Sequence, residues 1–372
     1  MTTILLKIMI PILNIIYTIF KVLPTQNKIV MISRQSNKIN NDFLLIGKKL
    51  EKEFKIVYLC KTLDGGVKSK TKHRILYGLH MFKQMFHLET SKVCILDSYC
   101  PTVSILNHKK KLTVIQMWHS IGTMKKFGWG ILDRKEGSYS QIAKIMKMHN
   151  NYDIVYASSE AYKEHLSIGF NISTEKIKIF TLPRIDLLNN KKYLKEIRSK
   201  IYNFYPQLNK KKNVIYAPTF RKNESSFNKH LNELIKYFDF SKYNLILKLH
   251  PLSKLKIENK QIIIDKEFST FEMLSIADKL ISDYSCVIYE AGIMNIPLYF
   301  YNYDMNSYTV VRGLALDYNE LPGYTENNAK NLVKCLEKEY DIKYMKKFIN
   351  KYVENTINCT DKIVSDIKKY MK

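Results

Sequence analysis

The stretch from Lys279 to Tyr301 reads KLISDYSCVIYEAGIMNIPLYFY. A short apolar run ends at Ser282, an apolar segment with helical spacing follows the loop Ser282–Ser285, and Pro297 precedes a second apolar run. This order of strand, loop, helix and strand predicts one βαβ unit of a parallel sheet.

Small polar residues stand where the helix of this unit is predicted to begin, namely Ser282, Asp283 and Ser285. The N–H groups at a helix N-terminus, together with small hydroxyl side chains, are suited to a phosphate. Alternatively, Asp283 or Ser285 simply caps the helix, which is the commoner role of such residues. The loops elsewhere in the chain decide between these two interpretations.

The same pattern continues in both directions along the chain. Nearly continuous apolar runs occur at 28–33, 54–60, 92–97, 112–118, 152–157 and 176–181, and again at 213–217, 244–249 and 261–264. Such runs are typical of strands that are buried on both faces of a parallel sheet. The sequence therefore predicts an α/β fold of two doubly wound, Rossmann-like domains facing a cleft.

A Lys- and Asn-rich segment, 189–212, separates the two series of strands. The predicted organisation is an N-terminal apolar, amphipathic segment over 1–27, an N-terminal domain over 28–195 and a C-terminal domain over 196–345. A C-terminal helix over 346–372 is predicted to pack back across the domains.

The chain of 372 residues carries 60 Lys and Arg against 34 Asp and Glu, a net charge of +26. A surface of this charge attracts nucleic acid, anionic membranes or phosphorylated substrates. Nucleic acid is disfavoured, because the Lys residues are spread along the chain and neither zinc-ligand spacing nor an RNP-type signature occurs. The six cysteines form no CxxC pair, which indicates reduced thiols in a cytosolic chain.

The N-terminus, Met1 to Leu23, is apolar but interrupted. Thirteen uncharged residues lie between Lys7 and Lys21, whereas a helix that spans a bilayer needs about 20 mostly apolar residues. The segment lacks an obvious cleavage site of small residues, which disfavours a signal peptide. A helix in the membrane interface and a buried core helix both fit the pattern. The segment Lys68 to Lys92, basic and then rich in aromatic and Met residues, leaves the same two alternatives and suits an anionic lipid surface.

A further loop, from Met117 to Gly128, reads MWHSIGTMKKFG. It places His119 directly after an apolar strand and then adds the cations Lys125 and Lys126. A titratable imidazole at a strand end can act as a general base, although a lone His there is more often a structural hydrogen-bonding group.

Two more strands end in polar groups that suit phosphoryl transfer. Thr219 and Arg221 in YAPTFRK offer a hydroxyl and a guanidinium fork to phosphate oxygens, and His250 ends the strand in KLHP. Glu290, in the helix after Ser285, could accept hydrogen bonds from sugar hydroxyls. Walker A, GxGxxG, HExxH and GxSxG motifs are absent from the sequence.

Five segments in this order, WHSIGTMKKFG, LPRIDLL, YAPTFR, KLHP and ISDYSCVIYEAGIMNIPLYFY, resemble the CDP-glycerol glycerophosphotransferase family of teichoic-acid primases and polymerases. The resemblance runs from about Lys28 to the C-terminus. It implies a GT-B glycosyltransferase-like fold in a peripheral protein at the cytoplasmic face of the cell membrane. It also implies transfer of a polyol phosphate from CDP-glycerol or CDP-ribitol to a lipid-linked, undecaprenyl-type acceptor, with release of CMP.

The resemblance also assigns roles by motif. His119 is the expected base on the acceptor hydroxyl, and His250 and Asp283 complete the catalytic set. The residues expected to bind the donor phosphates and nucleotide are Thr219, Arg221, Ser282, Ser285 and Glu290. The residues expected on the acceptor side are Lys125, Lys126, Arg184 and Asp186. The chain departs from the family pattern at Ser120, Cys286 and Glu290, which bears on the identity of the donor.

Several alternatives stay open at this point. The donor is CDP-glycerol or CDP-ribitol, with glycerol phosphate preferred, or the protein is a GT-B transferase that uses a nucleotide-sugar. A non-catalytic basic protein of the membrane surface is the third class. No metal site is assigned, although Asp283 and Asp304 leave room for a divalent ion. A homo-oligomer is compatible with the sequence.

Overall fold

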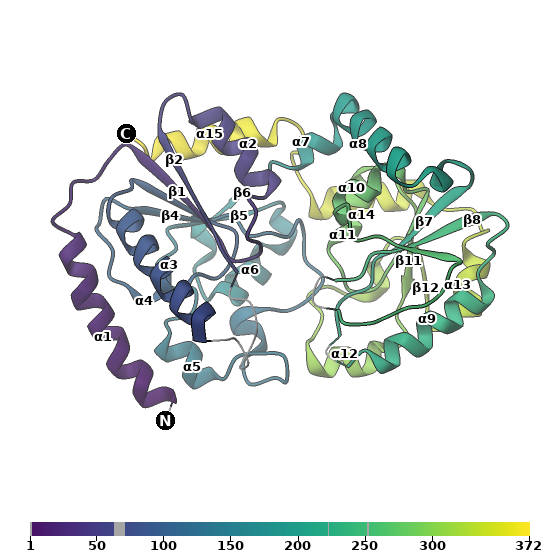
Figure 1. Ribbon diagram of the computed structural model, residues 1–372, viewed down its shortest axis with the longest axis horizontal. Coiled ribbons are helices and arrows are strands. Elements are labelled where there is room, and N and C mark those ends of the chain that lie inside the picture. Colours follow the sequence, from purple (N-terminus) through teal and green to yellow (C-terminus); the bar gives the residue numbers. More distant parts are fainter. Residues whose placement is uncertain (1, 63–70, 222, 251–252) are drawn as a thin grey trace. The chain divides into compact units, whose positions relative to one another are not determined.

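A computed structural model describes residues 2–62, 71–221, 223–250 and 253–372 (Figure 1). Three parts of the predicted segments lie outside these residues: the start of the predicted lipid-facing segment at Lys68, Lys222 in YAPTFRK, and Pro251 in KLHP. The chain forms two compact units. Unit 1 contains Met1–Ser120, Lys126–Asp186 and Glu354–Lys372, and unit 2 contains Ile121–Lys125 and Leu187–Val353. All six cysteines are free thiols.

Unit 1 is built on a six-stranded parallel sheet in the order β2-β1-β3-β4-β5-β6. Each strand is short, and most of the side chains of β1, β3, β4 and β5 are buried. The strands are β1 Lys28–Ser33, β2 Lys55–Cys60, β3 Val93–Leu96, β4 Thr113–Gln116, β5 Ile154–Ala157 and β6 Ile177–Ile179.

Helices pack on both faces of this sheet, because successive side chains of a buried strand point to opposite sides. Val30 and Ile32 share one core cluster with Tyr17, Leu88 and Phe170. On the other side of the unit α15 packs against α2. The helices of unit 1 are α1 Thr2–Phe20, α2 Asn41–Leu50, α3 Thr71–Glu89, α4 Pro101–Ile105, α5 Ser140–Ile145, α6 Lys163–Phe170, α7 Ile185–Leu188, which continues into unit 2, and α15 Cys359–Lys369.

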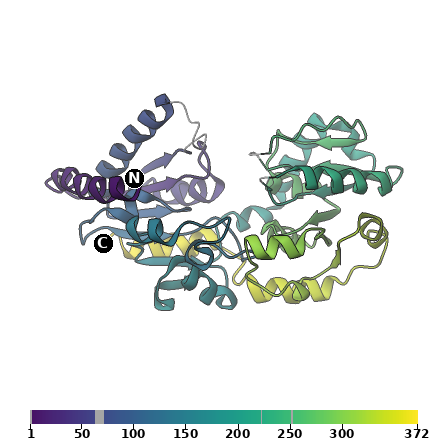
Figure 2. The same cartoon turned by 90° about the horizontal axis from the view of Figure 1, so that it is seen from below.

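Helix α1 packs beside α3 at the edge of unit 1, as Figures 1 and 2 show. One side of α1 is anchored, since the Asn14 side-chain amide donates to the Ile105 carbonyl and the Tyr17 hydroxyl contacts His108 Nδ1 at 2.7 Å. The opposite side carries exposed large apolar side chains. By length and composition α1 is the one helix among the described residues that could cross a membrane, with a mean hydropathy of 2.0 over Thr3–Phe20.

Unit 2 contains a second six-stranded parallel sheet, in the order β12-β11-β10-β7-β8-β9. The strands are β7 Lys212–Tyr216, β8 Tyr243–Leu247, β9 Ile262–Ile264, β10 Lys279–Ser282, β11 Leu298–Tyr301 and β12 Tyr324–Glu326. The helices are α8 Lys191–Phe204, α9 Ser225–Tyr237, α10 Thr270–Met273, α11 Val287–Ile293, α12 Met305–Val311, α13 Ala329–Cys335 and α14 Ile342–Tyr352.

The stretch from Lys279 to Tyr301 forms the predicted βαβ unit, β10-α11-β11, with Leu280 opposite Leu298 in parallel register. Helices α9 and α13 bury apolar side chains against one face of the sheet, in a core cluster that includes Val214, Tyr216 and Tyr299. The prediction of two doubly wound α/β halves with parallel sheets is therefore confirmed. The domain limits predicted from the sequence stay predictions.

Candidate active site

The sheet order of unit 2 reverses between β7 and β10. From β7 the chain proceeds outward to β8 and β9, and it then returns to β10 and continues through β11 to β12. In doubly wound sheets, ligands bind outside the carboxyl ends of the strands at such a point. The two loops at this point are 217–221 after β7 and 283–286 after β10, which carry the predicted site residues Thr219, Arg221, Asp283 and Ser285.

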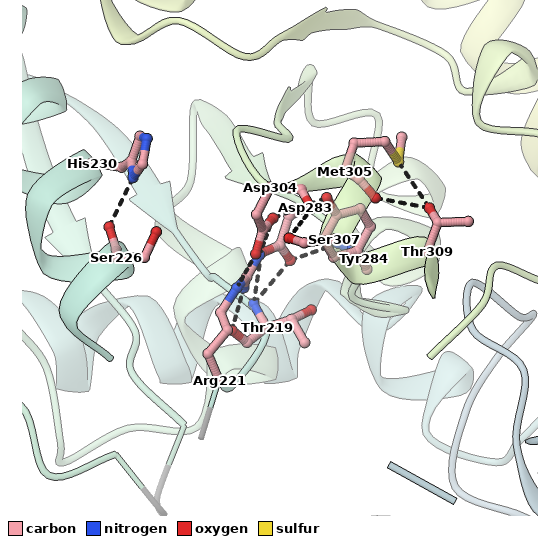
Figure 3. A network of polar contacts seen from close by, with 10 residues as sticks. All are labelled: Thr219, Arg221, Ser226, His230, Asp283, Tyr284, Asp304, Met305, Ser307 and Thr309. Carbon is pink, nitrogen blue, oxygen red and sulfur yellow. Dashed lines mark hydrogen bonds and ion pairs between the residues drawn. The ribbon is translucent and has the colours of Figure 1, made fainter. Parts of the chain in front are cut away.

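A buried ion-pair network joins these loops (Figure 3). Asp283 is fully buried, and its carboxylate accepts from the Thr219 backbone N–H at 2.9 Å and from Arg221 Nη1 at 2.5 Å. Arg221 also donates through Nε and Nη2 to both carboxylate oxygens of Asp304, at 2.9 and 3.0 Å. Burial lowers the pKa of Arg221, but the two carboxylates outweigh it and raise that pKa above its ordinary value.

Three tyrosine rings surround the Arg221 guanidinium, which lies 5.5 Å from the ring centre of Tyr284, 5.4 Å from that of Tyr303 and 5.6 Å from that of Tyr308. Cation–π contacts of this kind hold a guanidinium plane in a fixed orientation. The structure thus gives Arg221 and Asp283 firm partners within the protein. Their predicted contacts with a donor stay predictions.

The other predicted donor-binding residues differ in their surroundings. Ser282 is buried and donates to the Ala217 carbonyl at 2.9 Å, so its hydroxyl links β10 to the end of β7. Ser285 is half-buried two residues before α11, and Glu290 is buried within α11. The Thr219 hydroxyl oxygen is buried and has no hydrogen-bond partner within the part of the chain that the structure describes. A buried hydroxyl of this kind suits a ligand oxygen.

Residues Ile121–Lys125 belong to unit 2, although the strand before them belongs to unit 1. The segment is fixed by pairing of Lys125 with Leu314 and by a 2.7 Å hydrogen bond from the Tyr289 hydroxyl to the Thr123 carbonyl. Gly122 has a φ of 63°, and a Cβ there would lie 2.5 Å from the Tyr289 ring, so only glycine fits.

Lys125 therefore lies beside the predicted donor-binding loops of unit 2. Burial lowers its pKa, Asp283 and Cys286 counter that effect, and Arg312 and Arg221 lower the pKa further. Sequence reasoning had assigned Lys125 to the acceptor side and had not singled out Arg312 at all. No signal in the sequence links residue 125 to residue 312.

His250 follows the strand β8 and packs against Phe220, with ring centres 5.3 Å apart. Burial of the ring lowers the pKa of His250, and the positive charge of Lys125 lowers this pKa further. The neutral imidazole is therefore favoured at pH 7. His250 and Thr219 line the same small cavity.

In unit 1 the sheet order reverses between β1 and β3, and His119 follows the neighbouring strand β4. Its Nδ1 lies 3.0 Å from the backbone carbonyl of Asp97. The Gln35 side-chain Nε2 lies 3.2 Å from the same Nδ1. In the tautomer that carries the proton on Nδ1, this proton is donated to the Asp97 carbonyl and Nε2 is the basic nitrogen. Trp118, with a φ of 63°, stacks on Phe127 and fixes the backbone just before the histidine.

Arg184 connects three segments of unit 1. Its Nη1 donates to the Asp42 carboxylate at 2.6 Å, and its Nη2 donates to the His119 carbonyl at 2.9 Å. Asp42, at the start of α2, was not singled out from the sequence. Arg184 thus holds the backbone at His119, while Lys126 is exposed in the same unit.

Asp186 has a different position. Its carboxylate accepts from the backbone N–H groups of Cys359 and Thr360, at 2.9 and 2.8 Å, and from the Thr360 hydroxyl at 2.6 Å. It therefore caps α15. Arg184 and Asp186 are two residues apart in LPRIDLL, but their side chains bind different parts of unit 1. Arg184 contacts Asp42 and His119, whereas Asp186 contacts the start of α15.

Asp97 is a further residue that sequence reasoning missed. It is buried next to Asn40, which donates to its carboxylate at 2.8 Å. Burial raises the pKa of Asp97 to about 6, and hydrogen bonds from Ser33, Ser98 and Asn40 offset only part of that effect. Its place as the polar last residue of the apolar run 92–97 was the signal that could have identified it.

No group of three or more His, Cys, Asp or Glu side chains that could hold a metal ion occurs among the residues that the structure describes. Asp304, which sequence reasoning had considered for a divalent ion, instead pairs with Arg221.

The motifs and both sheets have counterparts in known proteins. A model of the family described as CDP-Glycerol:Poly(glycerophosphate) glycerophosphotransferase matches residues 15–367. The teichoic acid ribitol-phosphate primase of Bacillus spizizenii strain W23 is 28% identical over 359 residues, 92% of this chain and 91% of the primase. The teichoic acid glycerol-phosphate primase of Bacillus subtilis strain 168 is 30% identical over 303 residues, 77% of this chain and 78% of that primase.

The fold is similar to that of the wall teichoic acid polymerase TagF, with a TM-score of 0.74 and 21% identity over 100% of this chain and 97% of the TagF chain. The architecture is thus GT-B-like, as the resemblance implied. Because the family match covers almost the whole chain, the protein belongs to the CDP-glycerol:poly(glycerophosphate) glycerophosphotransferase family of enzymes.

Proposed function

We propose that this enzyme transfers glycerol phosphate from CDP-glycerol to a lipid-linked acceptor in the synthesis of teichoic acid or a related wall or capsule polymer. CMP is the product that leaves. The observation that carries the proposal is the grouping of Lys125, His250 and the buried Thr219 hydroxyl at the strand ends of unit 2. These groups supply positive charge and hydrogen bonds where a pyrophosphate would need them.

The roles follow from the state of each group. The Thr219 hydroxyl and Lys125 would hold phosphate oxygens, and the ring N–H of the neutral His250 would donate a hydrogen bond as charge develops on the leaving CMP. His119, with Nε2 as its basic nitrogen, would accept the proton of the acceptor hydroxyl. The Arg221–Asp283–Asp304 network would hold the loop geometry rather than take part in proton transfer.

The decisive measurement is release of CMP from CDP-glycerol, with and without a membrane-derived lipid acceptor. We expect release that depends on the acceptor, and we expect His119→Ala and His250→Ala to abolish it in folded protein. Turnover of a UDP-sugar without turnover of any CDP-polyol would reject the proposal in favour of a glycosyltransferase. Vesicle binding by folded protein without turnover of any donor would favour a non-catalytic role.

CDP-ribitol is the second candidate donor. The similarity to a ribitol-phosphate primase extends over 92% of this chain, compared with 77% for the glycerol-phosphate primase. The same assay with CDP-ribitol beside CDP-glycerol separates the two donors. A higher kcat/KM for CDP-ribitol would replace glycerol phosphate by ribitol phosphate without changing the reaction class.

We also propose that the protein is peripheral at the cytoplasmic face of the cell membrane, where a lipid-linked acceptor is found. The support is the α1–α3 apolar face, which we define as the exposed apolar side chains Ile4, Leu5, Ile8, Met9, Ile12, Ile15 and Ile19 of α1 and Ile75, Leu76, Leu79, Phe82 and Phe86 of α3. The bonds from Asn14 and Tyr17 hold the other side of α1 to unit 1, which favours a helix that lies in the interface over one that spans the bilayer. Flotation with anionic vesicles tests this proposal, and protein that stays at the bottom of the gradient would reject it.

A further inference from the structure

A cavity of about 490 Å³ lies in unit 2 at the carboxyl ends of β11 and β12. Its walls come from residues 302–307, which lead from β11 into α12, and from residues 325–327 at the end of β12. The loops with the predicted donor-binding residues follow β7 and β10, so this cavity is at the same edge of the sheet but beyond them.

The cavity differs in chemistry from the rest of the protein. Amide, hydroxyl and carboxylate side chains line it, among them Asn306, Asn327 and Glu326, and none of the described residues in its lining is Lys, Arg or His. In a chain with 60 Lys and Arg, a cavity without a cation is poorly suited to a phosphate. Such a lining instead suits a neutral group that carries several hydroxyls, because each hydroxyl both donates and accepts.

Two polar atoms in the lining have unmet hydrogen-bonding capacity. Asn302 Oδ1 and the Tyr303 hydroxyl are buried, and neither has a hydrogen-bond partner among the residues that the structure covers. Buried polar atoms are normally paired, and an exception is a candidate for a ligand contact. Asn302 Oδ1 is an acceptor only, so the partner that it needs is a donor such as a hydroxyl.

The cavity is connected to the predicted donor-binding loops through Asp304 and Tyr303, which line it and both contact Arg221. Asp304 lines the cavity and accepts two hydrogen bonds from Arg221, whose Nη1 in turn bonds to Asp283 of the β10 loop (Figure 3). A donor whose phosphates lie at the β7 and β10 loops would therefore extend its next chemical group toward this cavity.

We propose that the cavity binds the polyol group of the donor, the short hydroxylated carbon chain beyond the distal phosphate, through Asn302, Asn306 and Asn327. This inference rests on the proposed function, and it assigns to these residues the choice between polyols of different length. No bond is made or broken in the cavity. Its role is to fix the polyol so that the attached phosphorus is aligned with the acceptor.

The test compares ligands that differ only in the polyol. Titration calorimetry of the full-length protein with CDP, CDP-glycerol and CDP-ribitol measures the contribution of the polyol as the ratio of Kd values. We expect Asn302→Leu to weaken the binding of CDP-glycerol or CDP-ribitol by about tenfold, because it removes a buried acceptor, while the Kd of CDP changes less than about twofold. Asn306→Ala, at an exposed position whose side chain makes no hydrogen bond with the residues that the structure describes, should act in the same direction without affecting the fold.

The matched control is Asn232→Ala, at an exposed position of α9 outside the cavity. It should leave all three Kd values unchanged. The inference would be overturned if folded Asn302→Leu and Asn306→Ala lost affinity for CDP and for the CDP-polyols to the same extent. It would also be overturned if both variants bound all three ligands as tightly as the wild type. If the wild-type protein bound neither CDP nor a CDP-polyol, the proposed function itself would fail, and the inference with it.

Discussion

At the scale of single residues, Arg221 is the centre of the unit 2 site. Four of the five N–H groups of its guanidinium are used within the protein, by Asp304, Asp283 and the Thr219 carbonyl. An arginine that is so fully engaged stabilises the loops first and can influence a ligand mainly through its charge. This pairing was not readable from the sequence, since Arg221 and Asp304 are 83 positions apart and no local pattern connects them.

Removing Arg221 should leave the fully buried carboxylate of Asp283 without its counter-charge. We expect Arg221→Leu to lower the free energy of unfolding by about 3–5 kcal/mol, the usual effect of breaking a buried ion pair from one side. Adding Asp283→Asn should recover part of this loss, because the uncompensated charge is then absent. Urea denaturation of the two single variants and the double variant measures the coupling, and strictly additive effects would contradict it.

Asp97 gives a pH dependence whose sign can be stated. Its pKa is about 6 in the folded protein and 3.8 for an unperturbed Asp, so the folded state still holds a proton between these values that the unfolded chain has lost. Stability must therefore fall as the pH rises from about 4 to about 6, by about 3 kcal/mol in total from this group. Asp97→Asn should remove that contribution.

Denaturation curves at pH 4, 5, 6 and 7 for the wild type and Asp97→Asn check this prediction. As the pH rises from 4 to 6, the free energy of unfolding of the wild type should fall relative to that of Asp97→Asn. The control is Asp361→Asn at an exposed position, where the difference from the wild type should not follow this trend. A difference that is constant with pH would show that Asp97 titrates normally.

At the scale of elements, the strands were the most predictable part. Nearly continuous apolar runs located, to within about two residues, eleven of the twelve strands in the described part of the chain. The missed strand, β12 at Tyr324–Glu326, has three residues, pairs on one side only and has one exposed and two half-buried side chains. Its sequence, Tyr-Thr-Glu, contains no apolar run. Loop positions were harder, because the segment Ile121–Lys125 joins unit 2 through the Tyr289 contact, which is distant in sequence.

The position of Asp186 leads to a prediction for α15. Asp186 accepts two backbone N–H groups at the start of this helix, whereas Asn358, at the N-cap position, makes no side-chain cap. We expect Asp186→Ala to lower the free energy of unfolding by about 0.5–2 kcal/mol, the usual effect of losing a helix cap. The KM for the lipid acceptor should stay the same in the folded variant.

Thermal and urea denaturation measure the first effect, and acceptor titration in the CMP-release assay measures the second. Asp361→Ala, which removes an exposed ion pair with Lys49, is the matched control and should change stability by less than about 1 kcal/mol. A large rise in the acceptor KM with unchanged stability would restore the acceptor-side role that the sequence suggested for Asp186.

At the scale of the whole molecule, the net charge of +26 and the α1–α3 apolar face together imply two separable contributions to membrane binding. Charge attracts the protein to an anionic surface over a distance that salt shortens, from about 10 Å at 0.1 M to about 3 Å at 1 M. Insertion of the apolar face depends on buried apolar area and is not weakened by salt in this way.

The two contributions predict different salt responses for two proteins. Wild-type protein should bind anionic vesicles at 0.1 M salt and keep a measurable part of that binding at 1 M. A variant with Ile12→Glu and Leu79→Glu, both on the apolar face, should bind weakly at 0.1 M and lose all binding at 1 M. Ile168→Glu, which introduces the same charge at an exposed position of α6 away from that face, should behave as the wild type. If salt removed wild-type binding as completely as it removes that of the double variant, attraction of charge alone would hold the protein at the membrane, and the apolar face would need another partner.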